Sequence, residues 1–199
     1  MPLRIELADY GVGNLHSIRK ALENCGAEVH VAEDMALLER AECIVLPGVG
    51  AFDRAMERLR PHGEAIVERL DEGVPCLGIC IGMQVLFQRS AEGASPGLGF
   101  LEGEVVRLSA PRVPHMGWNE VVTADAIMDG IEDRHFYFAH SFRGRPTDGS
   151  AVGHTDHFGS FPSLFRKRNV YGTQFHPEKS SSAGLAFLRN FVRFAEGCA

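Results

Sequence analysis

Hydrophobic residues in the first ninety positions alternate between short continuous runs and helical spacing. The segment LRIELA at 3–8 predicts a strand, and apolar residues then recur every three or four positions up to Gly26, where a helix would end. The unbroken runs CIVLP and VPCLGIC predict buried strands. Helical spacing fills 52–72 between them and returns over MQVLFQRS. This alternation predicts a parallel sheet with helices on both faces.

The pattern changes after Gly93, where Gly and Pro become frequent and short alternating runs replace the strand and helix rhythm. These runs predict pieces of antiparallel or mixed sheet. VYGTQF then reads as a further core strand, and helical spacing from about Ser182 predicts a final helix. With 199 residues, we expect one compact domain spanning 1–199.

Composition narrows the functional classes. The formal net charge of -6 counts against nucleic acid or an anionic membrane as the main partner. Neither an apolar stretch of roughly 18 residues nor a secretory signal is visible, so we expect a cytoplasmic protein. Five cysteines without a regular spacing indicate reduced thiols, of which one could be reactive.

A glycine-flanked cysteine is the strongest chemical signal. Residues 78–82 read Gly-Ile-Cys-Ile-Gly between an apolar strand and a predicted helix, which is the cysteine form of a nucleophile elbow. The helix start would favour the Cys80 thiolate and present the Ile81 N–H to an oxyanion. A merely buried thiol is the commoner fate of a free cysteine, and a zinc site that uses Cys76 is a weaker alternative.

A base and its orienting group follow VYGTQF. Pro177 favours an extended His176, and side chains two apart in an extended segment point the same way, so we expect Glu178 to face the imidazole. Taken alone, a surface turn explains this segment equally well. The glycine-rich loop after CIVLP could supply a further oxyanion N–H, although an ordinary tight turn explains it too. We expect the loops after Pro47, Cys80 and Phe175 to converge.

These motifs together resemble the class I, triad-type glutamine amidotransferases. The resemblance spans nearly the whole chain and rests on PGVGAF, GICIGMQ, the His140-Ser141 pair and QFHPEKS. DYGVGN and PHMGWN are similar to the glutaminase subunit of a synthase that makes imidazole glycerol phosphate. The fold implied is a flavodoxin-like, mostly parallel open sheet flanked by helices, with an added mixed or antiparallel sheet.

The resemblance also implies roles for individual residues, and no cofactor or metal. Cys80, His176 and Glu178 would be catalytic, and an oxyanion would lie near Val49, Gly50 and Ile81. Glutamine would be bound by a set that comprises Gly48, Gln84, Glu92, Ser141 and Phe142. A cyclase subunit would form a heterodimer with this chain near Asn14, Met116 and Trp118, and would receive the ammonia for histidine biosynthesis. From the sequence alone, Trp118 could equally be a core aromatic.

Two other functions remain open at this point. An α/β-hydrolase acting on esters or lactones could use a cysteine elbow, but it normally places its acid before its histidine. A nucleotide-binding module is suggested by Gly11-Val12-Gly13, although a third glycine and a Walker lysine are missing from the expected spacing.

Overall fold

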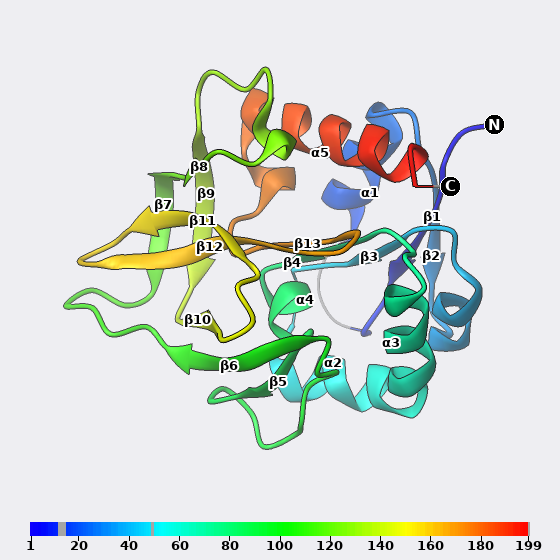
Figure 1. The fold of residues 1–199 in the computed structure, drawn as a ribbon, viewed down its shortest axis with the longest axis horizontal. Helices are drawn as coiled ribbons and strands as arrows, with labels where there is room; N and C mark the ends of the chain where they lie inside the picture. Colours follow the sequence, from blue (N-terminus) through cyan, green and yellow to red (C-terminus); the bar gives the residue numbers. More distant parts are fainter. Residues whose placement is uncertain (12–14, 49, 199) are drawn as a thin grey trace.

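A central sheet runs through the computed structural model, which describes residues 1–11, 15–48 and 50–198 (Figure 1). Within these residues the sheet has eight strands in the order β2-β1-β3-β4-β13-β12-β11-β8. In that order they are Glu28–Ala32, Arg4–Ala8, Ile44–Leu46, Cys76–Ile79, Val170–Thr173, Ser160–Lys167, Ala151–Asp156 and Val122–Thr123. The pairs from β2 to β13 are parallel, and those from β13 to β8 are antiparallel.

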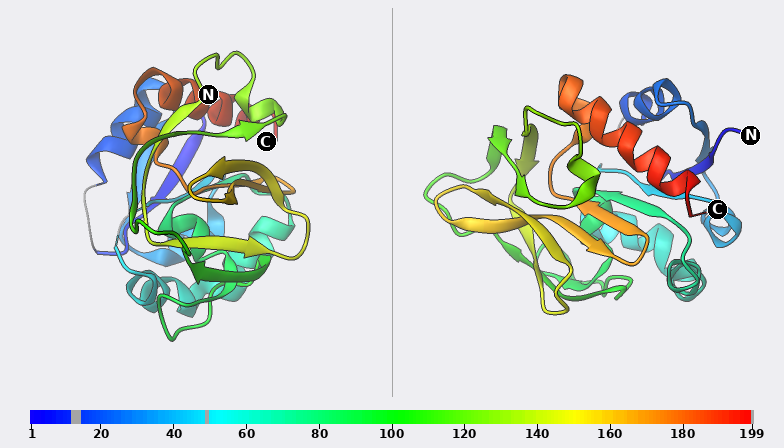
Figure 2. Two further views of the ribbon diagram at one scale, coloured as in Figure 1. Left: turned by 90° about the vertical axis from the view of Figure 1, so that its left-hand side faces the viewer. Right: turned by 45° about the horizontal axis from the view of Figure 1, so that its top comes forward.

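Helices cover both faces of the parallel part, as Figures 1 and 2 show. Helices α1 (His16–Asn24) and α5 (Ser181–Glu196) lie together on one face. The other face is covered by α2 (Phe52–Leu59), α3 (Gly63–Asp71) and α4 (Ile81–Gln84). Each layer closes one of two clusters of buried apolar side chains. The buried strands need this double cover because both of their faces are apolar.

Two smaller sheets flank the antiparallel end. The first has the order β10-β6-β5, from Phe142–Pro146, Leu101–Arg107 and Phe87–Ser90. The second pairs β7 (His115–Glu120) with β9 (His135–His140) in antiparallel fashion. The short 3-10 helices are η1 (Met35–Arg40), η2 (Arg60–His62), η3 (Ala126–Met128) and η4 (Pro177–Lys179).

The class of fold predicted from the sequence is confirmed, with one local error. The helix expected over MQVLFQRS ends after a single turn at Gln84, and Phe87–Ser90 is strand β5 instead. Pairing of β5 with β6, for example Phe87 with Leu101, decides the conformation of this segment. No helix in the described part of the chain is both long and apolar enough to cross a bilayer.

Candidate active site

Three loops meet at the carboxyl ends of β3, β4 and β13, which are neighbours in the parallel sheet. They carry Gly48, Cys80 and His176, as the sequence predicts. The approach is close, because a methyl group added to Gly48 would lie 2.8 Å from Cε1 and 3.0 Å from Nδ1 of His176. Gly48 is therefore glycine in order to make room for the imidazole.

The turn at Cys80 is a strained elbow. Cys80 has φ 49° and ψ -106°, a backbone conformation that residues other than glycine rarely adopt. A Cβ on Gly82 would lie 1.9 Å from the carbonyl oxygen of Leu46, and one on Gly78 would lie 2.7 Å from that of Gly82. Both flanking glycines are thus sterically required, and the Cys80 N–H is held by the Thr173 carbonyl at 2.6 Å.

Electrostatic support for the thiolate differs from the sequence-based expectation. Helix α4 has four residues, so the dipole of a long helix does not point at Cys80. What remains is local: Ile81 is the first residue of α4, and the N–H of a first helical residue has no partner within its helix. Ile81 is therefore well placed to donate towards a developing negative charge.

His176 is held between an acid and the thiol. Its Nδ1 donates to Glu178 Oε1 at 2.9 Å, and the Cys80 side chain lies close enough to raise the pKa of the imidazole. His176 is extended, as expected, with φ -104° and ψ 95°, but Glu178 lies in the 3-10 turn η4, so the two side chains meet across this turn and not by alternation along a strand. Both side chains are nearly fully buried.

The surroundings favour a charged imidazole. Burial alone would lower the pKa of His176, but hydrogen bonds and charges from Cys80 and Glu178 outweigh it and raise the pKa to about 9. The ring is therefore favoured to carry two protons at neutral pH, and a ring in that state can act as a proton donor.

A residue with no role assigned from the sequence, Ser180, fixes this loop. Its hydroxyl accepts from the Tyr137 N–H at 2.9 Å and donates to the His176 carbonyl at 2.6 Å. The His176 N–H in turn donates to the Tyr137 carbonyl at 2.8 Å. These bonds to Tyr137 of β9 hold the backbone of His176 in place. The only sign of this arrangement in the sequence is the serine at the end of QFHPEKS.

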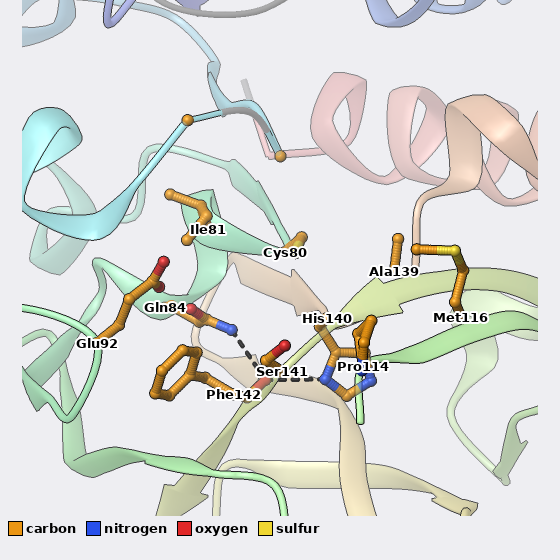
Figure 3. Close-up of a pocket in the computed structure, with 12 residues that line it drawn as sticks. Cys80, Ile81, Gln84, Glu92, Pro114, Met116, Ala139, His140, Ser141 and Phe142 are labelled. Atoms are coloured by element: carbon orange, nitrogen blue, oxygen red, sulfur yellow. Dashed lines mark hydrogen bonds between the residues drawn. The ribbon is translucent and has the colours of Figure 1, made fainter. Parts of the chain in front are cut away.

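A cavity of about 350 Å³ opens beside the sulfur (Figure 3). Its walls include nine residues that the sequence analysis had assigned to the site: Gly48, Gly50, Cys80, Ile81, Gln84, Glu92, Met116, Ser141 and Phe142. Pro114, Ala139 and His140 complete the lining. Val49 and Asn14 lie outside the described residues.

The two ends of this cavity differ in character. Glu92 lies at one end, where burial and the charge of Asp53 raise the pKa of its carboxyl group. Met116 lies at the other end and is 64% exposed. Trp118 follows on the same strand, does not line the cavity and is 53% exposed, so it is no core aromatic.

Polar side chains behind the cavity connect its walls. Gln84 Nε2 donates to the Phe142 carbonyl at 3.1 Å and lies 3.5 Å from Gln174 Oε1. Gln174 Nε2 in turn reaches the Cys80 sulfur at 3.7 Å. Gln174 belongs to the QFHPEKS motif and His140 to the His140-Ser141 pair, but no role for either residue follows from the sequence. Among the described residues, no group of three or more His, Cys, Asp or Glu is arranged to hold a metal ion.

This chain thus has a glycine-flanked cysteine and a histidine-carboxylate pair, both at the carboxyl edge of a parallel sheet. This combination is typical of α/β proteins that use a thiol as nucleophile. The model of the family "Glutamine amidotransferase class-I" matches residues 6–194. The subunit HisH of imidazole glycerol phosphate synthase from Methanothermobacter thermautotrophicus is 43% identical over 94% of this chain and 97% of the relative. The same subunit from Halobacterium salinarum is 44% identical over 96% and 93%.

This chain therefore belongs to the class-I glutamine amidotransferase family and, within it, to the HisH subunits. A solved structure supports the fold independently. PurLQS from Thermotoga maritima superimposes with a TM-score of 0.70 at 22% identity, covering 98% of this chain and 99% of that one.

Proposed function

We propose that this chain, as one domain spanning 1–199, hydrolyses glutamine to glutamate and ammonia through Cys80, His176 and Glu178. The observation that carries the proposal is the strained elbow at Cys80, whose side chain lies beside an imidazole that Glu178 orients. Such an arrangement supplies a nucleophile, an acid-base group and a fixed tautomer.

The reaction has two halves. The Cys80 sulfur attacks the side-chain amide carbon of glutamine, and His176 gives its proton to the nitrogen as the carbon-nitrogen bond breaks and ammonia leaves. Water then attacks the thioester, His176 takes the proton of that water, and glutamate departs from the restored cysteine. In both halves the negative oxygen would be held by the N–H groups of Ile81 and of the loop at 49–50.

Glutamine binding falls to the walls of the cavity. Glu92 is suited to pair with the α-ammonium group of the substrate, at the end of the cavity away from Met116. The Phe142 carbonyl already accepts two hydrogen bonds, so the contribution of the Ser141-Phe142 segment falls to its N–H groups and the Ser141 hydroxyl. Gln84 and Gly48 complete the binding set.

The ammonia is proposed to pass to a cyclase subunit in a cytoplasmic heterodimer. That subunit would make imidazole glycerol phosphate and an aminoimidazole carboxamide ribotide, which is histidine biosynthesis. Support comes from the names of the relatives, which describe a subunit of a synthase. The exposed Met116 and Trp118 near the mouth of the cavity form the proposed contact surface, together with Asn14.

The test uses the heterodimer with Cys80→Ser, and Cys25→Ser as the matched control at a half-buried thiol. We expect Cys80→Ser to lower glutamate release by about 10⁶, as removal of a nucleophile does elsewhere. Synthesis driven by added ammonium salt should persist, because the cyclase chemistry lies in the other chain. Full glutamate release by the variant, or faster cleavage of an ester than of glutamine by the parent, would contradict the proposal.

A further inference from the structure

Three imidazoles, those of His115, His140 and His157, lie together outside the Cys80, His176 and Glu178 group, and His140 is also part of the cavity wall. His115 lies between Phe138, at a ring-centroid distance of 4.6 Å, and His157, at 4.1 Å. The edge of His115 meets His140, with 3.0 Å between Nδ1 of the former and Nε2 of the latter. His115 and His140 face each other because they are partners in the β7 and β9 pairing. Two histidines buried side by side need a reason, since a charge on either would be costly there.

Their hydrogen bonds admit one arrangement of protons. The Asn119 amide is oriented at both ends, because its Nδ2 donates to the Asp156 carbonyl and its Oδ1 accepts from the Glu120 N–H. The same Nδ2 lies 3.2 Å from His115 Nε2, which must therefore accept. A neutral His115 then carries its proton on Nδ1 and donates to His140.

The chain of donors ends on a backbone carbonyl. Because His140 accepts at Nε2, its own proton must be on Nδ1, and this nitrogen lies 2.8 Å from the Phe142 carbonyl oxygen. The direction of donation is thus the same from Asn119 to Phe142. A second proton on either ring would place two N–H groups face to face.

The titratable groups around the pair favour neutral rings. Burial, and then the charge of His157, lower the pKa of His115 to about 4. Burial lowers the pKa of His140 to about 3, with further lowering by the charges of His115, His157 and His176, against a raising effect of the Phe142 carbonyl. None of these contributions comes from a carboxylate. Both rings therefore keep one proton each over the physiological range.

The Phe142 carbonyl at the end of the chain also accepts from Gln84 Nε2, as Figure 3 shows. This bond leaves Gln84 Oε1 buried and without a hydrogen-bond partner, on a side chain that lines the cavity. A buried acceptor of this kind is satisfied by a donor from a bound ligand. The orientation of the Gln84 amide therefore depends on where the Phe142 carbonyl points.

We propose that His140, with its tautomer set by His115, is a positioning residue that aims the Phe142 carbonyl and thereby fixes Gln84 for glutamine. The proposal rests on the proposed function for the identity of the substrate. Neither imidazole exchanges a proton with glutamine, and their effect reaches it through Gln84. The function of the pair is therefore recognition, and the reactivity of the sulfur is left to His176.

The test compares four variants of the heterodimer. His140→Leu removes the donor to Phe142 and should raise the KM for glutamine about tenfold, the loss expected for one buried hydrogen bond, with a smaller change in kcat. His140→Asn keeps an N–H near the position of Nδ1 and should restore the KM to within about threefold of the parent. His115→Phe keeps the ring stack but frees the His140 tautomer, so the KM should rise although His115 does not line the cavity. His157→Phe is the matched control. It keeps an aromatic ring stacked on His115 but alters no member of the hydrogen-bond chain, so its KM should equal that of the parent.

Two readouts separate positioning from damage to the fold or to the nucleophile. The alkylation rate of Cys80 by iodoacetamide without glutamine should stay within about twofold of the parent in His140→Leu, because His176 is untouched. Nitrogen-15 shifts of the parent should show both rings neutral and protonated at Nδ1, an observation that needs no activity. An unchanged KM in His140→Leu, or a ring protonated at Nε2, would overturn the proposal. A parent that releases no glutamate overturns the proposed function instead, and the tautomer measurement still decides the hydrogen-bond chain.

Discussion

Replacing Glu178 by glutamine tests the histidine-carboxylate pair most directly, because it keeps the shape of the side chain and removes its charge. The pKa of about 9 for His176, against an ordinary value near 6.5, corresponds to about 3 kcal/mol in favour of the imidazolium. Both Cys80 and Glu178 raise this pKa, so removing the charge of Glu178 should lower the pKa of His176 in Glu178→Gln.

A second effect concerns the tautomer. Glu178 Oε1 accepts a hydrogen bond from the Nδ1–H group of His176, whereas Glu178 Oε2 is buried without a hydrogen-bond partner. An amide nitrogen in the Oε2 position would be buried without an acceptor, so the amide is driven to rotate and to donate to Nδ1. The ring would then carry its proton on Nε2, towards the sulfur, where it cannot accept a proton from water. We expect kcat for glutamine to fall by about 10² to 10⁴, the range seen for comparable substitutions in other triads.

The assay is glutamate release by the heterodimer between pH 6 and pH 10, together with the nitrogen-15 titration of His176. Asp133→Asn is the matched control. Asp133 also bonds a histidine two residues away, at 2.8 Å, but this pair is exposed and should leave both measurements unchanged. The reasoning is refuted if Glu178→Gln keeps kcat within about threefold of the parent and His176 still titrates near pH 9.

Three further predictions concern the structure around the site. Gly82→Ala should destabilise the protein by at least about 3 kcal/mol in urea unfolding, because its Cβ would lie 1.9 Å from the rigid Leu46 carbonyl oxygen; a midpoint equal to that of the parent would contradict the steric account. Ser180→Ala should lower the free energy of unfolding by about 1 to 3 kcal/mol, because the Tyr137 N–H loses its acceptor. It should also lower kcat, whereas the position of a cavity-lining residue such as Glu92 should not change. Stability should fall between pH 7 and pH 5 by about 2 kcal/mol on account of His140, since the unfolded ring binds a proton below about pH 6.5 and the folded ring does so only near 3; the slope in urea unfolding should be smaller in His140→Asn.

Strands β3 and β4 are predictable because parallel strands covered on both faces read as unbroken apolar runs. The exception, residues 87–90, shows the limit of this reasoning. Apolar residues in MQVLFQRS fit a helix as well as a strand that is buried at its two ends, at Phe87 and Ser90. The conformation of such a short segment is decided by the strand with which it pairs. The pairing of β5 with β6 is a tertiary contact that cannot be inferred from the spacing of apolar residues.

The proposed nucleophile, Cys80, is more predictable from the sequence than the proposed base, His176. Two glycines around Cys80 have a steric reason that is visible in the sequence. A carboxylate two residues from a histidine is not selective, because Asp133 and His135 share this spacing on the surface. His176 differs from His135 because it follows the carboxyl end of β13, which lies next to β4, the strand that precedes Cys80. That adjacency becomes known only with the strand order.

The pair of neutral imidazoles depends on information of a third kind, the register between two strands. His115 and His140 are 25 residues apart in sequence and become partners only because β7 and β9 pair in one register. A shift by one residue would turn His115 to the opposite face of the sheet, where Met116 now lies. Since Met116 and Trp118 occupy the exposed face of β7 and His115 faces inward, the same register that presents the proposed contact surface also places the donor that fixes His140. The proposed positioning of glutamine and the proposed contact surface thus depend on a single strand pairing.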